Sequence, residues 1–250
     1  MERNGRESVV KIPTSDYKLS WVAREIEGLK RGACDNLVRV ESVEQVTFSL
    51  GKRVVMTFEY IDGLVIDEAI RTDRWPSPDQ VRELLRGVLS GLAVLHGGET
   101  VHRDMKLANL VLQDGDWRRP VILDLGLARL LDDKGITKYP VALGTEEFMA
   151  PEVIQGARAQ KATDLWSLGI IAYILLTHVH PFHGDYDDRV NDVEALERIV
   201  AGPAHMGADV PSDLTSLIGR WLTVDPDHRG TALDAIAALD VGTSSTSNSA

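Results

Sequence analysis

The spacing of hydrophobic residues predicts mainly helices from about residue 64 onward. In residues 77–96 apolar side chains recur three and four positions apart, which is the period of one face of an α-helix. Ser77 is a suitable N-cap for this helix, and Pro78 suits its first position. The same spacing predicts four further helices, at residues 161–177, 191–201, 212–223 and 231–239.

Short runs rich in β-branched and aromatic residues predict the strands. These runs are residues 7–12, 46–50, 53–61, 110–112 and 121–123. Asn4-Gly5 is a hairpin signal directly before the first of them. One helix is predicted among the early strands, at residues 17–32, because apolar residues there follow helical spacing and the run ends at a glycine. The polar tail at 242–250 is expected to be disordered, since it has little apolar surface to bury.

Composition narrows the functional classes. The chain has 250 residues, 44% hydrophobic and 26% charged, which is typical of a soluble protein with one large domain or two lobes around a cleft. The formal net charge of −11 disfavours nucleic acid and anionic membranes as general partners. Cys34 is the only cysteine, so no intrachain disulfide can form and a cytoplasmic location is expected. The longest apolar run, residues 168–176, is too short to span a membrane and is expected to be a buried helix.

The densest cluster of reactive side chains lies in the stretch VHRDMKLANLVLQ, residues 101–113. Asp104 is at the centre of this loop, and Asn109 and Asp124 flank the two short strands that follow. On the base of a β-hairpin these three side chains would converge, and their oxygen atoms are ligands that Mg²⁺ prefers. Lys106 adds a positive charge beside them. A carboxylate that orients a nucleophile, a lysine and a metal-binding pair are together what phosphoryl transfer requires.

Each of these residues also has a simpler interpretation. Asp104 suits a helix cap or a turn, Asp124 suits the turn that ends a strand, and Lys106 suits a solvated loop. The combination, rather than any single residue, therefore favours a phosphoryl-transfer site.

Five motifs, in order along the chain, resemble those of eukaryotic-type Ser/Thr protein kinases. They are HRDMKLAN (102–109), DLG (124–126), GTEEFMAPE (144–152), DLWSLG (164–169) and DPDHRGTA (225–232). The resemblance runs from about residue 9 to residue 239, and Leu125 stands where the family usually has phenylalanine. It implies an α+β, bilobal fold, in which a small sheet and one helix form an N-lobe (residues 1–61) and a larger, mainly helical C-lobe follows (residues 62–241).

The resemblance also assigns a role to each residue of the cluster. Asp104 would orient the hydroxyl group of the protein substrate and accept its proton. Lys106 would contact the γ-phosphate of ATP, as in kinases that act on Ser and Thr. Asn109 and Asp124 would hold the metal ion, Mg²⁺ or Mn²⁺.

ATP would bind in the cleft between the lobes. Lys11 resembles the strand lysine that pairs with the α- and β-phosphates, and Glu25 is its preferred helix partner, with Glu27 as the second choice. A solvated surface charge is the simpler interpretation of these residues. The resemblance places four residues around the adenine: Phe58 behind the ring, Glu59 and Ile61 at its edge through their backbones, and Val111 beneath it. Ordinary strand core explains these four equally well.

Regulatory and structural residues are implied as well. Arg103 resembles the arginine that reads a phosphorylated activation loop. Thr137 is the expected autophosphorylation site, because a phosphate there would bring a charge of about −1.5 to −2 for Arg103 to pair with; self-association for phosphorylation in trans is expected with it. Glu152 and Arg229 are expected to form a buried ion pair, and Asp164 is expected to accept backbone N–H groups of the catalytic loop.

One family feature is missing from the sequence. Ten residues precede Lys11, and they contain no glycine-rich loop that could cover the phosphates of ATP. Three explanations are open: the natural chain begins further upstream, the sequence is a fragment with a truncated N-lobe, or the protein is a minimal or non-catalytic kinase-like module.

Three functions therefore compete. The first is an ATP- and Mg²⁺-dependent kinase that phosphorylates Ser and Thr in protein substrates. The second is a pseudokinase scaffold that binds partners and transfers no phosphate. The third is a small-molecule kinase of the aminoglycoside type, which shares an H-x-D…N pattern. The segment with GTEEFMAPE and DLWSLG speaks against the third function, because in the family that segment builds a surface for peptides.

Overall fold

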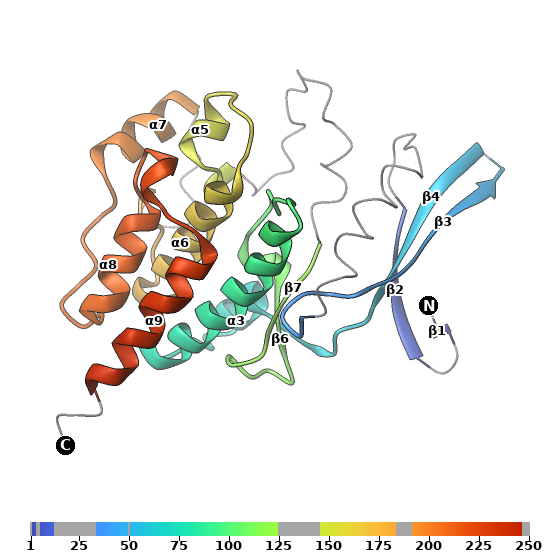
Figure 1. The fold of residues 1–250 in the computed structure, drawn as a ribbon, viewed down its shortest axis with the longest axis horizontal. Helices are drawn as coiled ribbons and strands as arrows, with labels where there is room; N and C mark the ends of the chain where they lie inside the picture. The colour runs from blue at the N-terminus through green and yellow to red at the C-terminus, as the bar shows by residue number, and fades with distance from the viewer. Residues whose placement is uncertain are drawn as a thin grey trace.

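The computed structural model describes residues 2–3, 6–12, 34–49, 51–124, 146–183 and 192–246. A four-stranded antiparallel sheet lies at one end of the molecule and a larger group of helices at the other (Figure 1). The sheet has the spatial order β1-β2-β4-β3 and contains β1 (Glu2–Arg3), β2 (Arg6–Lys11), β3 (Val40–Phe48) and β4 (Gly51–Glu59). β1 pairs with β2 through Arg3 and Arg6, which confirms the expected hairpin.

The hydrophobic pattern of the sequence predicts β4 more accurately than β3. In β4, Val54, Met56 and Phe58 are buried while their neighbours are more exposed, the two-residue period of a strand. β3 begins at Val40, so the predicted start at residue 46 was wrong. The first half of β3 was missed because exposed Glu41 interrupts the apolar run, and further exposed polar residues follow it. A register shift between Val40 and Ser42 marks a bulge near this start.

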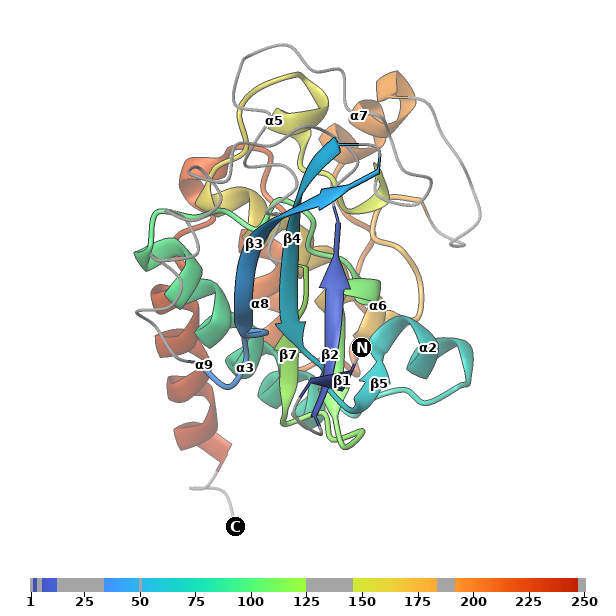
Figure 2. The same ribbon diagram turned by 90° about the vertical axis from the view of Figure 1, so that its right-hand side faces the viewer.

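A second sheet lies between the first sheet and the helices. It consists of β5 (Gly63–Val65), β6 (Leu110–Gln113) and β7 (Pro120–Ile122), all antiparallel. Leu110 pairs with Ile122, so β6 and β7 form the hairpin that the sequence led us to expect. Seen from the side, β2, β3 and β4 lie in front of the helices, with α2 to one side (Figure 2).

The helical part contains seven α-helices among the described residues and three short 3₁₀ helices. The α-helices are α2 (Ile66–Arg71), α3 (Pro78–Gly97), α5 (Pro151–Ile154), α6 (Lys161–Thr177), α7 (Asp192–Ala201), α8 (Ser212–Trp221) and α9 (Ala232–Thr246). The 3₁₀ helices are η1 (Leu107–Asn109), η2 (Glu146–Phe148) and η3 (Pro226–His228). The mixture of separate sheets and helices confirms the α+β class.

Helix α6 is the centre of the core. It occupies the predicted residues 161–177 and is buried continuously from Thr163 to Leu175, so the expected core helix is confirmed. α3 packs against α6, α9 and β7. Its start is also confirmed, because the Ser77 hydroxyl accepts the Gln80 N–H and the Gln80 side chain accepts the Ser77 N–H. Across the ranges that the structure describes, no helix is long and apolar enough to cross a membrane.

Two glycines let α3 approach β7 closely. A Cβ atom on Gly87 would lie 2.5 Å from Pro120 Cγ, and one on Gly91 would lie 2.8 Å from Ile122 Cδ1. Both distances are shorter than real side-chain contacts allow. The strand that leads to Asp124 is therefore held against a helix surface that has no side chain at these points.

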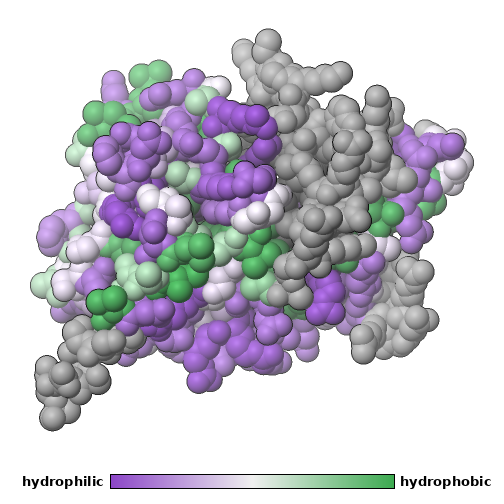
Figure 3. Space-filling view, viewed as in Figure 1, coloured by the Kyte–Doolittle hydropathy of each residue, from purple (hydrophilic) through white to green (hydrophobic). Residues whose placement is uncertain are grey.

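Several predicted boundaries differ from the structure. α8 ends at Trp221 rather than 223, and α9 continues to Thr246, so part of the tail predicted to be disordered from residue 242 is helical. The remaining tail residues, 247–250, and the predicted helix at 17–32 lie outside the described residues. α9 also carries exposed Leu233 and Val241, and hydrophobic atoms appear among hydrophilic ones over this helix (Figure 3). Single exposed apolar side chains of this kind are ordinary on a protein surface.

Candidate active site

The loop before η1 brings Asp104, Lys106 and Asn109 into direct contact. Lys106 Nζ lies 2.9 Å from Asp104 Oδ2. The Asn109 side-chain nitrogen donates to the Asp104 backbone oxygen at 2.7 Å and to Asp104 Oδ2 at 3.1 Å. Asn109 is buried, whereas Asp104 and Lys106 are half-buried. One oxygen of the Asp104 carboxylate, Oδ2, thus contacts both the Lys106 ammonium group and the Asn109 amide nitrogen.

The backbone of this loop is fixed by Asp164 of α6. The N–H of His102 donates to Asp164 Oδ2 at 2.9 Å and that of Arg103 donates to Oδ1 at 2.8 Å. His96 Nε2 lies 2.9 Å from the same Oδ2. Arg103 has a φ of 68°, a left-handed conformation that costs about 1–3 kcal/mol in a residue other than glycine. Two N–H groups directed at one buried carboxylate offset this cost, and the predicted role of Asp164 is confirmed.

His102 connects the loop to the end of β7. Its side chain is fully buried, and Nδ1 accepts the Asp104 N–H at 3.3 Å. Nε2 lies 2.8 Å from the backbone oxygen of Leu123, which can only accept, so Nε2 carries the proton. His102 therefore ties Asp104 to the residue before Asp124. We did not assign this role from the sequence, and neither did we assign the role of His96.

Asp124 follows directly in the chain and forms an ion pair with Lys11 of β2. The N–H of Leu123 donates to the backbone oxygen of Asn109 at 2.8 Å, which places Asp124 near Asn109. Asp124 has a φ of 47°, a second left-handed residue at this site. The ion pair brings together two predicted residues that are 113 positions apart in the sequence.

The residues expected around an adenine lie on β4, on β6 and in the segment after β4. Phe58 is buried and pairs with Val9 of β2 and Val40 of β3. The Glu59 carboxylate accepts the N–H of Arg39 at 2.7 Å. Ile61 is half-buried and Val111 is buried at 4% exposure. Phe58 and Glu59 thus belong to the first sheet and Val111 to the second, and Ile61 lies in the segment between β4 and β5.

Three residues named as candidates in the sequence lie outside the described residues: Glu25, its alternative Glu27, and Thr137. Arg103 is described, and its side chain lines the same small cavity as Asp104.

The donor set fits a Mg²⁺ ion that is shared with a phosphate ligand. Asn109 and Asp124 offer an amide oxygen and a carboxylate, which are hard ligands of the type Mg²⁺ prefers. Within the described ranges, no group of three or more His, Cys, Asp or Glu side chains could hold a metal alone. Mg²⁺ commonly uses one or two protein ligands together with substrate phosphates and water. The small number of ligands here is consistent with that arrangement.

A buried ion pair supports the segment that faces Asp104 across a small cavity. Arg229 is 0% exposed, and its two terminal nitrogens donate to Glu152 Oε1 at 2.8 Å and Oε2 at 2.9 Å. The same guanidinium donates to the backbone oxygens of Thr223, Ala162 and Val224. Its carbon lies 4.9 Å from the ring centroid of Trp166. The predicted pair is confirmed, and it fixes α5 to α6 and to the loop after α8.

Comparison with known proteins agrees with this geometry. Residues 4–239 match the family model described as protein kinase domain, so the chain belongs to the protein kinase family. It is 31% identical over 219 residues to the serine/threonine-protein kinase PkaA of Streptomyces coelicolor, covering 87% of this chain and 39% of PkaA. It is 31% identical over 243 residues to the probable serine/threonine-protein kinase PkwA of Thermomonospora curvata, covering 94% of this chain and 31% of PkwA. The chain thus spans well under half the length of these curated relatives.

A solved structure shows the same fold. The crystal structure of Rad53 1-466 in complex with AMP-PNP aligns with a TM-score of 0.73 and 26% sequence identity, covering 93% of this chain and 57% of that chain. The bilobal protein-kinase fold expected from the sequence motifs is therefore confirmed.

Proposed function

We propose that this chain is an ATP-dependent protein kinase domain that phosphorylates Ser and Thr residues in protein substrates. The observation that carries the proposal is the contact of Asp104 with Lys106 and Asn109, on a loop that the buried Asp164 holds in place. The kinase relatives and the Rad53 structure with AMP-PNP, an ATP analogue, support the same chemistry. A cytoplasmic location is part of the proposal.

Asp104 acts on the acceptor hydroxyl in this proposal. A carboxylate held by Asn109 and Lys106 is preorganised, so it orients the hydroxyl group and accepts its proton without rearranging. Lys106 is close enough to Asp104 for its ammonium group to neutralise charge on the transferring phosphoryl group nearby. Proton acceptance and charge neutralisation thus come from neighbouring side chains.

The remaining polar residues bind the nucleotide in this proposal. Lys11 would exchange its contact with Asp124 for the α- and β-phosphates of ATP, and Glu25 would orient it. Asn109 and Asp124 would hold Mg²⁺ or Mn²⁺, which neutralises phosphate charge when bound. The adenine would lie between the sheets, against Phe58, Val111 and the backbones of Glu59 and Ile61. The proposal takes residues 1–61 as an N-lobe and residues 62–241 as a C-lobe.

Regulation by phosphorylation belongs to the same proposal. Arg103 would pair with a phosphate on Thr137, and a second copy of the chain would deliver that phosphate in trans. The position of Arg103 beside Asp104 supports this link, because an ordered Arg103 side chain would stabilise the adjoining catalytic loop.

The test is transfer of the γ-phosphate from ATP to a generic protein substrate and to the chain itself. We expect incorporation at Ser and Thr that requires Mg²⁺ or Mn²⁺ and is lost in Asp104→Asn. Asp209→Asn, an exposed aspartate in a loop before α8, is a matched control that should retain activity. Phosphate incorporation that survives Asp104→Asn would come from a contaminant.

The alternative is a pseudokinase scaffold that binds partners and transfers no phosphate. The same assay separates the two functions. Binding of ATP without transfer, under conditions in which a known kinase is active, would support the scaffold and contradict the proposal.

A further inference from the structure

Two buried side chains anchor consecutive backbone carbonyls of η2. His180 Nε2 lies 3.0 Å from the backbone oxygen of Glu147, and the Ser167 hydroxyl donates to the backbone oxygen of Phe148 at 2.7 Å. His180 is 2% exposed and Ser167 is 7% exposed. Both side chains come from α6 or the loop that follows it, whereas η2 lies in the segment that precedes α5. The rigid core helix therefore holds η2 at two adjacent points.

The contacts of His180 fix its protonation state. Nδ1 accepts the backbone N–H groups of Phe182 and His183, each at 3.2 Å, so this nitrogen carries no proton. The neutral ring then carries its proton on Nε2, where it donates to the Glu147 carbonyl. Burial lowers the pKa of His180 to about 4, which keeps the ring neutral near pH 7. One side chain thus joins η2 to the turn after α6 through a donor on one side and an acceptor on the other.

Packing leaves the ring little freedom to move. His180 stacks on His183 with ring centroids 4.4 Å apart and meets Phe182 edge-on at 6.0 Å. Phe182 in turn stacks on Trp166 of α6 at 5.3 Å. The position of the Glu147 carbonyl is therefore set by a chain of contacts that ends in the core.

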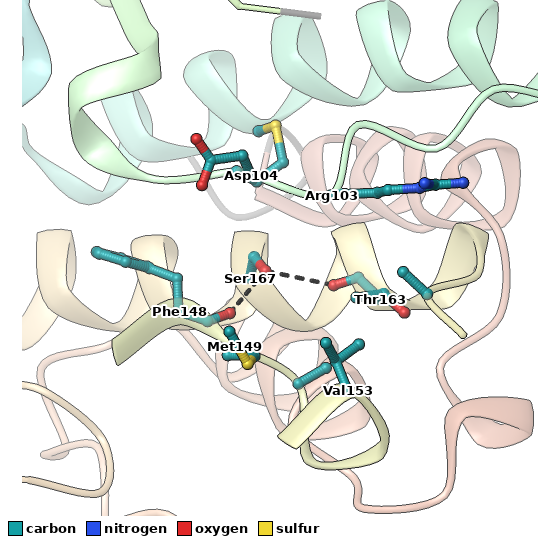
Figure 4. A pocket seen from close by; sticks show the side chains of 10 residues that line it. Arg103, Asp104, Phe148, Met149, Val153, Thr163 and Ser167 are labelled. Carbon is teal, nitrogen blue, oxygen red and sulfur yellow. Dashed lines mark hydrogen bonds between the residues drawn. The ribbon is translucent and has the colours of Figure 1, made fainter. Parts of the chain in front are cut away.

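The segment held in this way faces the proposed catalytic aspartate. Phe148, Met149 and Ala150 line one wall of a small cavity, and Arg103, Asp104 and Met105 line the other. Figure 4 shows Ser167 hydrogen-bonded to Phe148, with Asp104 on the opposite side of the cavity. The cavity volume is about 20 Å³, roughly that of one water molecule, so it is a narrow gap between two walls rather than a ligand chamber. The width of this gap depends on where η2 is anchored.

We propose that His180 and Ser167 are positioning residues, which hold η2 and the residues after it at the distance from Asp104 that an acceptor peptide requires. The inference rests on the proposed kinase function. It assigns the positioning of the segment that contacts the acceptor peptide to two residues outside the loop of Asp104. Because neither residue lies among the proposed nucleotide contacts, the inference separates acceptor binding from ATP binding. Loss of either hydrogen bond to η2 should therefore raise the Michaelis constant for the peptide and leave the Michaelis constant for ATP unchanged.

Two substitutions of His180 separate its donor from its acceptor. Glutamine can place an amide nitrogen near the position of Nε2 and keep the donor to Glu147. Asparagine can place its oxygen near Nδ1, which keeps the acceptor for Phe182 and His183 but cannot reach Glu147. We expect His180→Asn to raise the peptide KM roughly tenfold, the effect of losing one buried hydrogen bond. His180→Gln should stay within about twofold of the wild type, and Ser167→Ala should resemble His180→Asn.

A control and a second measurement keep the outcomes distinct. His205→Asn changes an exposed histidine in the loop after α7 and should leave all kinetic constants unchanged. Amide hydrogen exchange of residues 146–150 should be faster in His180→Asn and Ser167→Ala, but not in His180→Gln. A merely structural role would lower the melting temperature of both His180 variants. It would also change kcat and both Michaelis constants in the two variants alike, and that result would overturn the inference.

Failure of the proposed function gives a different result from failure of the inference. A wild-type chain that transfers no phosphate would overturn the kinase function, and hydrogen exchange alone would then decide whether His180 positions η2. An active wild type with equal peptide KM and equal exchange rates in His180→Asn would overturn the inference and leave the kinase function standing.

Discussion

Breaking the ion pair between Glu152 and Arg229 should strongly destabilise the helical part of the molecule. The Arg229 side chain is 0% exposed and that of Glu152 is 11% exposed, so water cannot replace either partner. Glu152→Gln preserves the shape of the side chain but removes its charge, which leaves the guanidinium buried without a counter-charge. Removing one partner of a buried pair costs about 3–5 kcal/mol. For a chain of this size that cost corresponds to a fall in melting temperature of about 10 °C.

The assay is urea denaturation followed by circular dichroism, with thermal unfolding as a second measurement. Glu99→Gln is the matched control, because Glu99 pairs with Lys161 at the surface, where their side chains are 83% and 45% exposed. Exposed pairs contribute about 0–1 kcal/mol. A loss in Glu152→Gln no larger than that in Glu99→Gln would refute the reasoning.

Two further predictions concern other buried polar groups. Asp164→Asn should lower kcat in the phosphate-transfer assay at least tenfold and destabilise the fold by about 2 kcal/mol. The reason is that the amide nitrogen of asparagine cannot accept the N–H of His102 or Arg103. A wild-type kcat in this variant would contradict the role of Asp164. His180 has a pKa of about 4 in the folded chain and an ordinary value of 6.5, so the folded state binds fewer protons between these values. The contribution of neutral His180 to the free energy of unfolding is complete above pH 6.5 and is lost as the pH falls to 4. It amounts to about 3 kcal/mol in total. Denaturation across this range should show a flatter pH dependence in His180→Gln than in the wild type, and parallel curves would contradict the assignment.

The parts of the fold that were predictable have local signals. The period of apolar residues gave α6 its observed bounds, and the Ser77-Pro78 pair marked the start of α3. β3 was predicted too short because its exposed glutamates resemble loop residues when the partner strand is unknown. α9 was predicted too short because the polar residues at its end carry no apolar period.

In the candidate site, too, the predictable features are those with a local signal in the sequence. The sequence pattern was sufficient to predict that Asp104, Lys106 and Asn109 lie together, because they are close to one another in a single loop. The roles of His96 and His180 depend on contacts with residues 68 and 33 positions away, so no local pattern identifies them. A buried histidine is also indistinguishable in sequence from an exposed one. Only the partners of its two ring nitrogens reveal what it does.

Gly87 and Gly91 have a practical consequence for anyone who wishes to engineer a more robust version of this chain. Replacing a glycine inside a helix by alanine is a common stabilising change, worth roughly 1 kcal/mol. At Gly219 in α8 an added methyl group would meet nothing within 4 Å, so the usual benefit applies. At Gly87 and Gly91 the same methyl group would push the helix away from β7, the strand that leads to Asp124. These two glycines should therefore not be replaced by alanine, although glycines inside a helix are the usual positions for that change.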